Sequence, residues 1–222
     1  MKQAQITSEN TAAKDLGVIF SSGIGGLTTI QEQVIKMHEK GPKSVSPMFV
    51  LTAIVNMAAG NIALRIGAKN ICTSVVTACA SGTNAIGEAY RQIKEGRAKV
   101  MVAGGAEASV NAHGTATKAN DAAEAKAINL VFGEDSRVLV GSTKAMTGHL
   151  LGAAGAIEAI AVVASLQKGR LPVNIGMTEQ DKECKVNVVT QAKAHPEKLE
   201  YALSNSLGFG GHNAVLAFRK WS

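Results

Sequence analysis

Residues 75–82 read Val-Val-Thr-Ala-Cys-Ala-Ser-Gly, and the rest of the fold is predicted to support this stretch. The apolar run predicts a buried strand that ends at Cys79, and the residues after it predict a helix from Ala80 to about Lys94. At a helix start several backbone N–H groups lack partners and the helix dipole is positive, so we expect a lowered pKa for the Cys79 thiol. Cys79 is therefore a candidate nucleophile, although a buried cysteine is more often a small apolar core residue.

The composition is that of a globular protein without a disulfide framework. Of the 222 residues, 46% are hydrophobic and 23 are glycine, which predicts a core with close backbone contacts. Three cysteines without metal-ligand spacing indicate reduced thiols and a cytoplasmic protein. We find no targeting pattern and no apolar run of membrane-spanning length, so no membrane is expected. The net charge of +6 is spread along the chain, and no motif supports nucleic-acid binding.

Strands and helices alternate along the chain, which predicts an α/β fold with short loops. Strands are predicted at 16–20, 71–76, 99–103, 137–141, 185–189, 202–206 and 214–218. Helices are predicted at 27–40, 47–65, 80–94, 121–132 and 150–168, with a further polar helix or arm at 1–15. The helix at 47–65 is apolar around most of its circumference, so we expect it between two layers or at a subunit interface.

Five motifs in a fixed order carry the candidate chemistry. They are the stretch around Cys79, Asn111-Ala-His113-Gly-Thr-Ala-Thr, Ser142-Thr-Lys144-Ala-Met-Thr-Gly-His149, Gly152-Ala-Ala-Gly-Ala-Ile-Glu158 and Asn205-Ser-Leu-Gly-Phe209-Gly-Gly. Together they resemble the long-chain elongating β-ketoacyl-[acyl-carrier-protein] synthases of type II fatty-acid synthesis, in the thiolase superfamily. The resemblance implies a layered αβαβα fold of two similar halves. Residues 1–110 would be the half with the nucleophile, and 111–222 the half with both histidines and the gate loop.

The resemblance also implies a function, the decarboxylative Claisen condensation that lengthens a fatty acyl chain by two carbons. Cys79 resembles the nucleophile that accepts the acyl chain, and its N–H with that of Phe209 would form the oxyanion hole. His113 and His149 resemble the pair that hydrogen-bonds the malonyl thioester carbonyl. The supporting residues would be Lys144 ion-paired with Glu158, Phe209 as a gate, and the acidic Asp121 and Glu124.

The same resemblance implies the partners of the protein. Acyl carrier protein would deliver acyl and malonyl groups on its phosphopantetheine, so no cofactor of the chain's own is expected, and the protein would be a homodimer. Zinc at Cys79, His113 and His149 is disfavoured, because the loops supply no fourth ligand and Cys72 is expected deep in a strand. A thiolase would carry a second cysteine in the last glycine loop, and a Cys-His-Asn synthase would lack His149.

Alternatives remain open at this stage. Without the motifs, both histidines could be loop or capping residues, and Lys144 and Glu158 could be solvated charges. Polyketide-type ketosynthases share nearly the same motifs, and a non-catalytic truncated module is possible because the family's opening strand and a long central block are absent. Val110 is followed directly by Asn111, so we expect joined pieces of a longer parent. Their Cα atoms would then lie several times further apart than the roughly 3.8 Å of a trans peptide.

Overall fold

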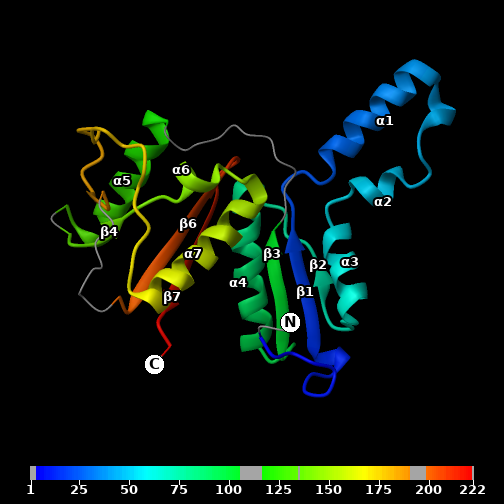
Figure 1. Ribbon diagram of the computed structural model, residues 1–222, viewed down its shortest axis with the longest axis horizontal. Coiled ribbons are helices and arrows are strands. Elements are labelled where there is room, and N and C mark those ends of the chain that lie inside the picture. Colours follow the sequence, from blue (N-terminus) through cyan, green and yellow to red (C-terminus); the bar gives the residue numbers. More distant parts are fainter. Residues whose placement is uncertain (1–3, 106–116, 135, 191–198, 222) are drawn as a thin grey trace. The chain divides into compact units, whose positions relative to one another are not determined.

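The computed structural model describes residues 4–105, 117–134, 136–190 and 199–221 (Figure 1). These residues form two compact units. The first unit contains 4–105 together with Leu150–Ile157 and Asn205–Leu216. The second contains the described residues within 117–149, 158–204 and 217–221. The predicted division at residue 110 into two halves of similar fold stays a prediction.

A parallel three-stranded sheet is the centre of the first unit. Its strand order is β2-β1-β3, with β1 at Leu16–Ser21, β2 at Cys72–Thr73 and β3 at Val100–Gly105. β1 and β3 pair along their whole length, whereas β2 is short. Strands followed by helices with parallel pairing confirm the predicted α/β class.

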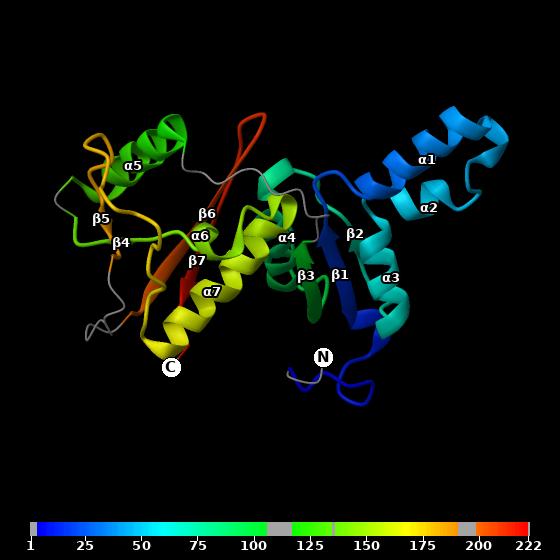
Figure 2. The same ribbon diagram turned by 45° about the horizontal axis from the view of Figure 1, so that its top comes forward.

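One helix covers each face of this sheet, as the ribbon shows in two orientations (Figure 1 and Figure 2). Successive side chains of a strand point to opposite faces, so neighbouring residues of β1 belong to different cores. Val18 packs against α3 (Met57–Ile66), whose Ala59 and Ala63 are buried. Ile19 packs against α4 (Ser81–Lys94) on the other face. The helix that follows Cys79 is thus fixed to the central strand, and its predicted bounds are confirmed.

The helical segment between β1 and β2 differs in part from the prediction. α1 (Leu27–Lys40) has the predicted bounds and ends at Gly41, followed by the 3-10 helix η2 (Pro42–Ser44). The single helix predicted at 47–65 is wrong, because extended backbone at Ile54 separates α2 (Phe49–Ala53) from α3. Nor is this segment enclosed between layers within the described chain: large apolar side chains such as Val50 and Leu64 are 59% and 82% exposed.

Two further expectations for the first unit are corrected. Residues 4–15 form turns and one short 3-10 helix, η1 (Ala13–Asp15), so the predicted N-terminal helix is wrong for the described residues. The predicted buried strand that leads up to Cys79 is wrong: it is reduced to β2, because only two residues pair with β1, and both are exposed. Cys72 is exposed rather than deep in a strand, so burial does not argue against it as a ligand.

The second unit contains α5 (Lys118–Phe132), α6 (Lys144–Thr147) and a parallel pair of strands, β4 (Leu139–Val140) with β5 (Asn187–Val188). Both strands are shorter than predicted. Asn129 of α5 donates a hydrogen bond of 2.9 Å to the carbonyl of Lys185, which ties the helix to the segment before β5. The motif that runs from Ser142 to His149 contains the single turn of α6.

Three elements near the end of the chain contribute residues to both units. They are α7 (Ala154–Lys168), β6 (Tyr201–Gly208) and β7 (His212–Arg219), and the 3-10 turn η4 (Leu151–Ala153) precedes α7. The strands predicted at 202–206 and 214–218 are present as β6 and β7, both longer than predicted. They pair in a two-stranded sheet, with only Phe209–Gly211 between them.

The helical stretch Leu151–Lys168 corrects the expectation that no apolar run is long enough to span a membrane. Its 18 residues meet that test by length and composition, with a mean hydropathy of 1.3. The same test is met by core helices of soluble proteins, and 39% of this stretch is buried inside the protein.

Candidate active site

Cys79 lies in a tight turn at the start of α4. The 3-10 turn η3 (Ala78–Ala80) runs directly into the helix, and the thiol residue is only 6% exposed. Ala78 has φ +47°, a left-handed conformation that side-chain-bearing residues rarely adopt. The position of Cys79 at a helix start is therefore confirmed, whereas no local sequence pattern predicted the left-handed residue before it.

Side-chain hydrogen bonds hold this turn in place. The Ser81 hydroxyl accepts from the Thr77 N–H at 3.0 Å and donates to the Ala78 carbonyl at 2.6 Å. The Asn84 side-chain amide donates to the Thr77 hydroxyl at 2.8 Å. Ser81 and Asn84 were not singled out from the sequence. The available signal was their spacing of four and seven residues from Thr77, within an otherwise small and apolar segment.

The glycine loop after β6 lies beside the same turn. A Cβ atom built on Gly208 would lie 2.9 Å from the Thr77 carbonyl oxygen, so only glycine allows this approach of the two backbones. Phe209 is the next residue, and its side chain is 68% exposed. The structure therefore brings together two of the predicted site segments within the first unit, the Cys79 turn and the Phe209 loop.

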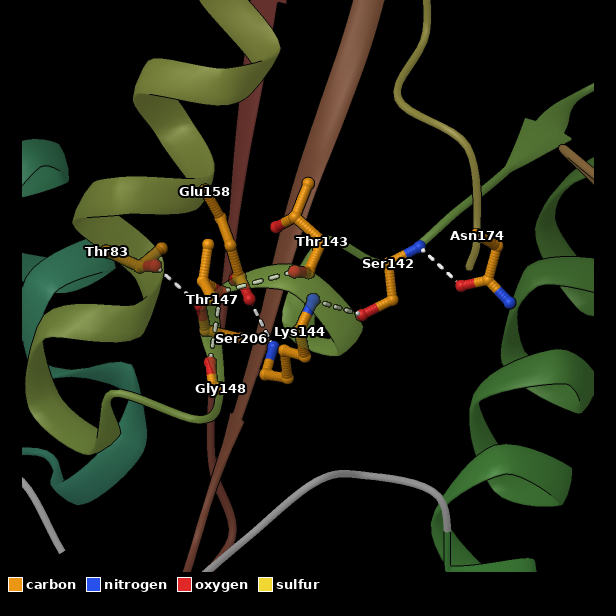
Figure 3. Close-up of polar contacts among 9 residues, drawn as sticks. All are labelled: Thr83, Ser142, Thr143, Lys144, Thr147, Gly148, Glu158, Asn174 and Ser206. Carbon is orange, nitrogen blue, oxygen red and sulfur yellow. Dashed lines mark hydrogen bonds and ion pairs between the residues drawn. The ribbon is translucent and has the colours of Figure 1, made fainter. Parts of the chain in front are cut away.

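In the second unit, Lys144 and Glu158 form an ion pair between α6 and α7 (Figure 3). Their side chains are only 16% and 15% exposed. The loop before α6 is braced by the Ser142 hydroxyl, which accepts from the Lys144 N–H at 3.2 Å. The ion pair implied by the family resemblance is present, and the alternative of two solvated surface charges is wrong.

The other predicted site residues are placed less completely. His149 is buried and belongs to the second unit. Asp121 and Glu124 lie in the first two turns of α5, where Asp121 accepts a hydrogen bond of 3.2 Å from Asn120. His113 lies outside the described residues, and so does the junction of Val110 and Asn111. The role of His113 and the distance between Val110 and Asn111 therefore stay predictions.

The remaining cysteines have surroundings unlike that of Cys79. Cys72 is exposed in β2, and Cys184 is partly exposed in the second unit. Burial, followed by the carboxylates of Asp181, Asp121 and Glu183, raises the pKa of the Cys184 thiol. Because the thiolate is the nucleophile, Cys184 is a poor competitor for an acyl group near neutral pH.

Comparisons with known proteins found a matching family, related sequences and similar structures. Residues 79–178 match the family described as Beta-ketoacyl synthase, C-terminal domain. A "3-oxoacyl-[acyl-carrier-protein] synthase 2" of Staphylococcus aureus (strain N315) is 31% identical over 327 positions, which cover 100% of this chain and 79% of the relative. A solved structure of a beta-ketoacyl synthase from Burkholderia phymatum STM815 superposes with a TM-score of 0.83 at 23% identity, covering 99% of this chain and 78% of that one.

A second solved structure is a type II polyketide synthase acyl-carrier protein in complex with its ketosynthase. It superposes with a TM-score of 0.88 at 21% identity, covering 100% of this chain and 82% of that one. These structural matches define the fold as that of a thiolase-like ketosynthase. On the identity and coverage of the S. aureus relative, the chain belongs to the β-ketoacyl-[acyl-carrier-protein] synthase family of fatty-acid synthesis.

The alignment also bears on the expected missing blocks. Its 327 positions exceed the 222 residues of this chain by 105, so the relative has about 105 residues there with no counterpart in this chain. This excess agrees with the prediction that a long block of the family is absent.

Proposed function

We propose that the chain catalyses the decarboxylative Claisen condensation that elongates a fatty acyl chain by two carbons. In the first step the Cys79 thiolate adds to the thioester carbonyl of acyl-[acyl-carrier-protein]. A new C–S bond forms, the carrier's C–S bond breaks, and the carrier leaves as its thiolate. The negative oxygen of the tetrahedral intermediate would be met by the backbone N–H groups of Cys79 and Phe209.

The observation that carries this proposal is the local structure of the first unit. The Cys79 thiol is buried at a helix start, where the positive end of the dipole favours a thiolate. The Gly208 backbone packs against the turn that presents the Cys79 thiol. The Phe209 N–H, one residue further on, therefore belongs to a segment that neighbours this turn. The left-handed Ala78 precedes this cysteine and the Ser81 brace follows it, and together they fix the turn that presents the thiol.

The second step would use the histidines. We assign to His113 and His149 the hydrogen bonds to the malonyl thioester carbonyl, on which charge develops as the carboxylate leaves as CO₂. The enolate carbon then attacks the acyl-cysteine carbonyl, and the Cys79 thiolate is released with the β-ketoacyl carrier as product. Lys144 and Glu158 would shape the field around His149 through their ion pair.

The proposal includes acyl carrier protein as the donor of both substrates, a cytoplasmic homodimer and no metal or organic cofactor. A carrier-protein complex of one solved ketosynthase with the same fold supports the choice of partner. The groups transferred arrive on the carrier's phosphopantetheine. The reaction therefore requires from this chain only a nucleophile, hydrogen-bond donors and a pocket that excludes water.

The test of the first step is mass spectrometry after mixing the chain with octanoyl-[acyl-carrier-protein]. We expect one octanoyl adduct, on Cys79, with none on the exposed Cys72 or on Cys184, whose pKa is raised. Cys79→Ala should abolish the adduct, and Cys72→Ser is the matched control that should retain it. An adduct on Cys72 or Cys184 with Cys79 unmodified would contradict the proposal.

The second step separates an enzyme from a non-catalytic module of the same fold. The alignment positions that are missing from this chain are the observation that favours such a module. With malonyl-[acyl-carrier-protein] added, the enzyme releases CO₂ and forms the β-ketoacyl carrier. His149→Ala should lose this turnover by more than about 100-fold yet still accept the octanoyl group on Cys79. Acylation without condensation in the unaltered chain would identify the module, and condensation retained in the His149 variant would remove that residue from the mechanism.

A further inference from the structure

Two buried hydroxyl groups connect the nucleophile helix to the strand that carries the glycine loop. Thr83 lies in the first turn of α4 and Ser206 in β6, and their side chains are 1% and 5% exposed. Their oxygen atoms are 2.6 Å apart, a hydrogen bond between residues 123 positions apart in sequence (Figure 3). Both residues belong to the first unit, as Cys79 and Phe209 do.

The first turn of α7 closes over this pair. A Cβ atom built on Gly155 would overlap the Thr83 hydroxyl oxygen and lie 2.8 Å from the Ser206 hydroxyl oxygen. No methyl group fits there, so the backbone of Gly155 packs directly on both hydroxyl groups. The Thr83–Ser206 pair is therefore in close contact with a third element, the start of α7.

A hydrogen bond between two buried hydroxyls adds little to the stability of the fold. Each loses its hydrogen bonds to water, and their mutual bond recovers little more than that loss. Apolar residues of similar size would fill the same space, but they would leave the sliding of β6 along α4 unspecified. What the hydroxyl pair adds is a fixed register between these two elements.

That register sets the spacing of the two N–H groups assigned to the oxyanion hole. Thr83 is four residues, or about one helical turn, after Cys79. Ser206 is three residues before Phe209, and the intervening Gly208 contacts the Thr77 carbonyl. We propose that Thr83 and Ser206 are positioning residues, which hold the Phe209 N–H at its working distance from the Cys79 N–H. This inference rests on the proposed function, because it concerns the same oxyanion hole.

The experiment compares two reactions of the same thiol. Transfer of the octanoyl group from its N-acetylcysteamine thioester passes through an oxyanion, whereas alkylation by iodoacetamide does not. The full chain carries Thr83→Val or Ser206→Ala, so that each variant removes one hydroxyl. Ser165→Ala is the matched control, since it removes a buried serine hydroxyl that donates to the Ala161 carbonyl at 2.7 Å, in the part of α7 assigned to the second unit.

We expect both variants to slow acyl transfer to Cys79 by about 10- to 100-fold, because a small displacement of an oxyanion donor has effects of this size. Alkylation of Cys79 should stay close to that of the unaltered chain, whereas the melting temperature should fall by a few degrees, because the remaining buried hydroxyl loses its partner. Thr83→Ser keeps the hydroxyl and should restore acyl transfer. The double variant should be no slower than the slower single variant, because one hydrogen bond is removed in each case.

Acyl transfer within about twofold of the unaltered chain in both variants would overturn the inference, and so would parallel losses of acyl transfer and alkylation. If Ser165→Ala slowed acyl transfer equally, the effect would be a general loss of packing, and the inference would again be wrong. Failure of the proposed function looks different: the unaltered chain would itself accept no octanoyl group on Cys79, and the positioning role would fall with it.

Discussion

The turns that open α4 and α7 share one backbone design, and only one of them carries a nucleophile. Each begins with a left-handed residue that is not glycine, Ala78 at φ +47° and Leu151 at φ +42°. Each is a three-residue 3-10 turn with an equivalent backbone hydrogen bond, from Ala80 to Thr77 at 3.0 Å and from Ala153 to Leu150 at 2.8 Å.

The two turns differ in the residue at their second position. In the first turn this residue is Cys79, and in the second it is Gly152. The carbonyl of Gly152 is so close to the opposing backbone that a Cβ on Gly82 would lie 2.8 Å from it, and one on Gly105 2.6 Å. The same backbone design therefore presents a thiol in one place and allows two backbones to touch in the other.

The largest expected effect comes from breaking the contact between the two turns. Gly82→Ala would place a methyl group against the Gly152 carbonyl and 3.0 Å from the Ala156 nitrogen, and neither backbone atom can rotate away. We expect the free energy of unfolding to fall by about 3 kcal/mol, measured by urea denaturation.

Gly87→Ala is the control for that variant, in the same helix. Its Cβ would meet only a side-chain atom of Leu216 at 3.9 Å, so the gain in helix propensity should raise stability by up to about 1 kcal/mol. Equal behaviour of the Gly82 and Gly87 variants would mean that the two turns are not in tight contact.

A smaller effect is expected from the side-chain brace, which the first turn has and the second lacks. Ser81 bonds both the Thr77 N–H and the Ala78 carbonyl, whereas Ala154 holds the matching first position of α7. Ser81→Ala should cost about 2 kcal/mol of unfolding free energy, because two partly buried backbone groups lose their partner.

Ser165→Ala is the comparison for the brace, measured by the same denaturation. This serine is also buried, but it donates only to a helix carbonyl, so its loss should cost less than about 1 kcal/mol. A cost for Ser81→Ala no greater than this would show that the left-handed turn holds its shape without the serine.

Local patterns in the sequence predicted α1 and the helix that follows the first turn. The bounds of α1 follow from glycines at both ends of an amphipathic run, and the start of α4 follows from small residues after an apolar run of sequence. The segment 47–65 was misjudged because its composition is helical throughout. The break at Ile54 depends on tertiary packing, which outweighs a weak local preference.

The residues of the candidate site also fall into two groups, those that the sequence predicted and those that it did not. Cys79, Phe209 and the Lys144–Glu158 pair were identified because family motifs keep them in order along the chain. The Thr83–Ser206 hydrogen bond was not, because its partners are 123 residues apart and neither lies at a motif position with assigned chemistry. The left-handed Ala78 was also missed, since alanine gives no signal for that conformation.

The smallest effect concerns Ala78 itself, and its sign is the informative part. The left-handed conformation costs an alanine about 1–2 kcal/mol, and glycine removes that cost while losing about 0.5–1 kcal/mol through its more flexible unfolded chain. Ala78→Gly should therefore raise the free energy of unfolding slightly, by about 0.5 kcal/mol.

Ala80→Gly, two residues further on, should do the opposite. Ala80 has φ −90° and is fully buried, so glycine relieves nothing there and should cost about 1 kcal/mol. Because glycine keeps the left-handed turn at position 78, Ala78→Gly should also retain acylation of Cys79 within about twofold, measured by mass spectrometry. A large loss of acylation in that stable variant would mean that the Ala78 methyl group, and not the backbone conformation, positions the thiol.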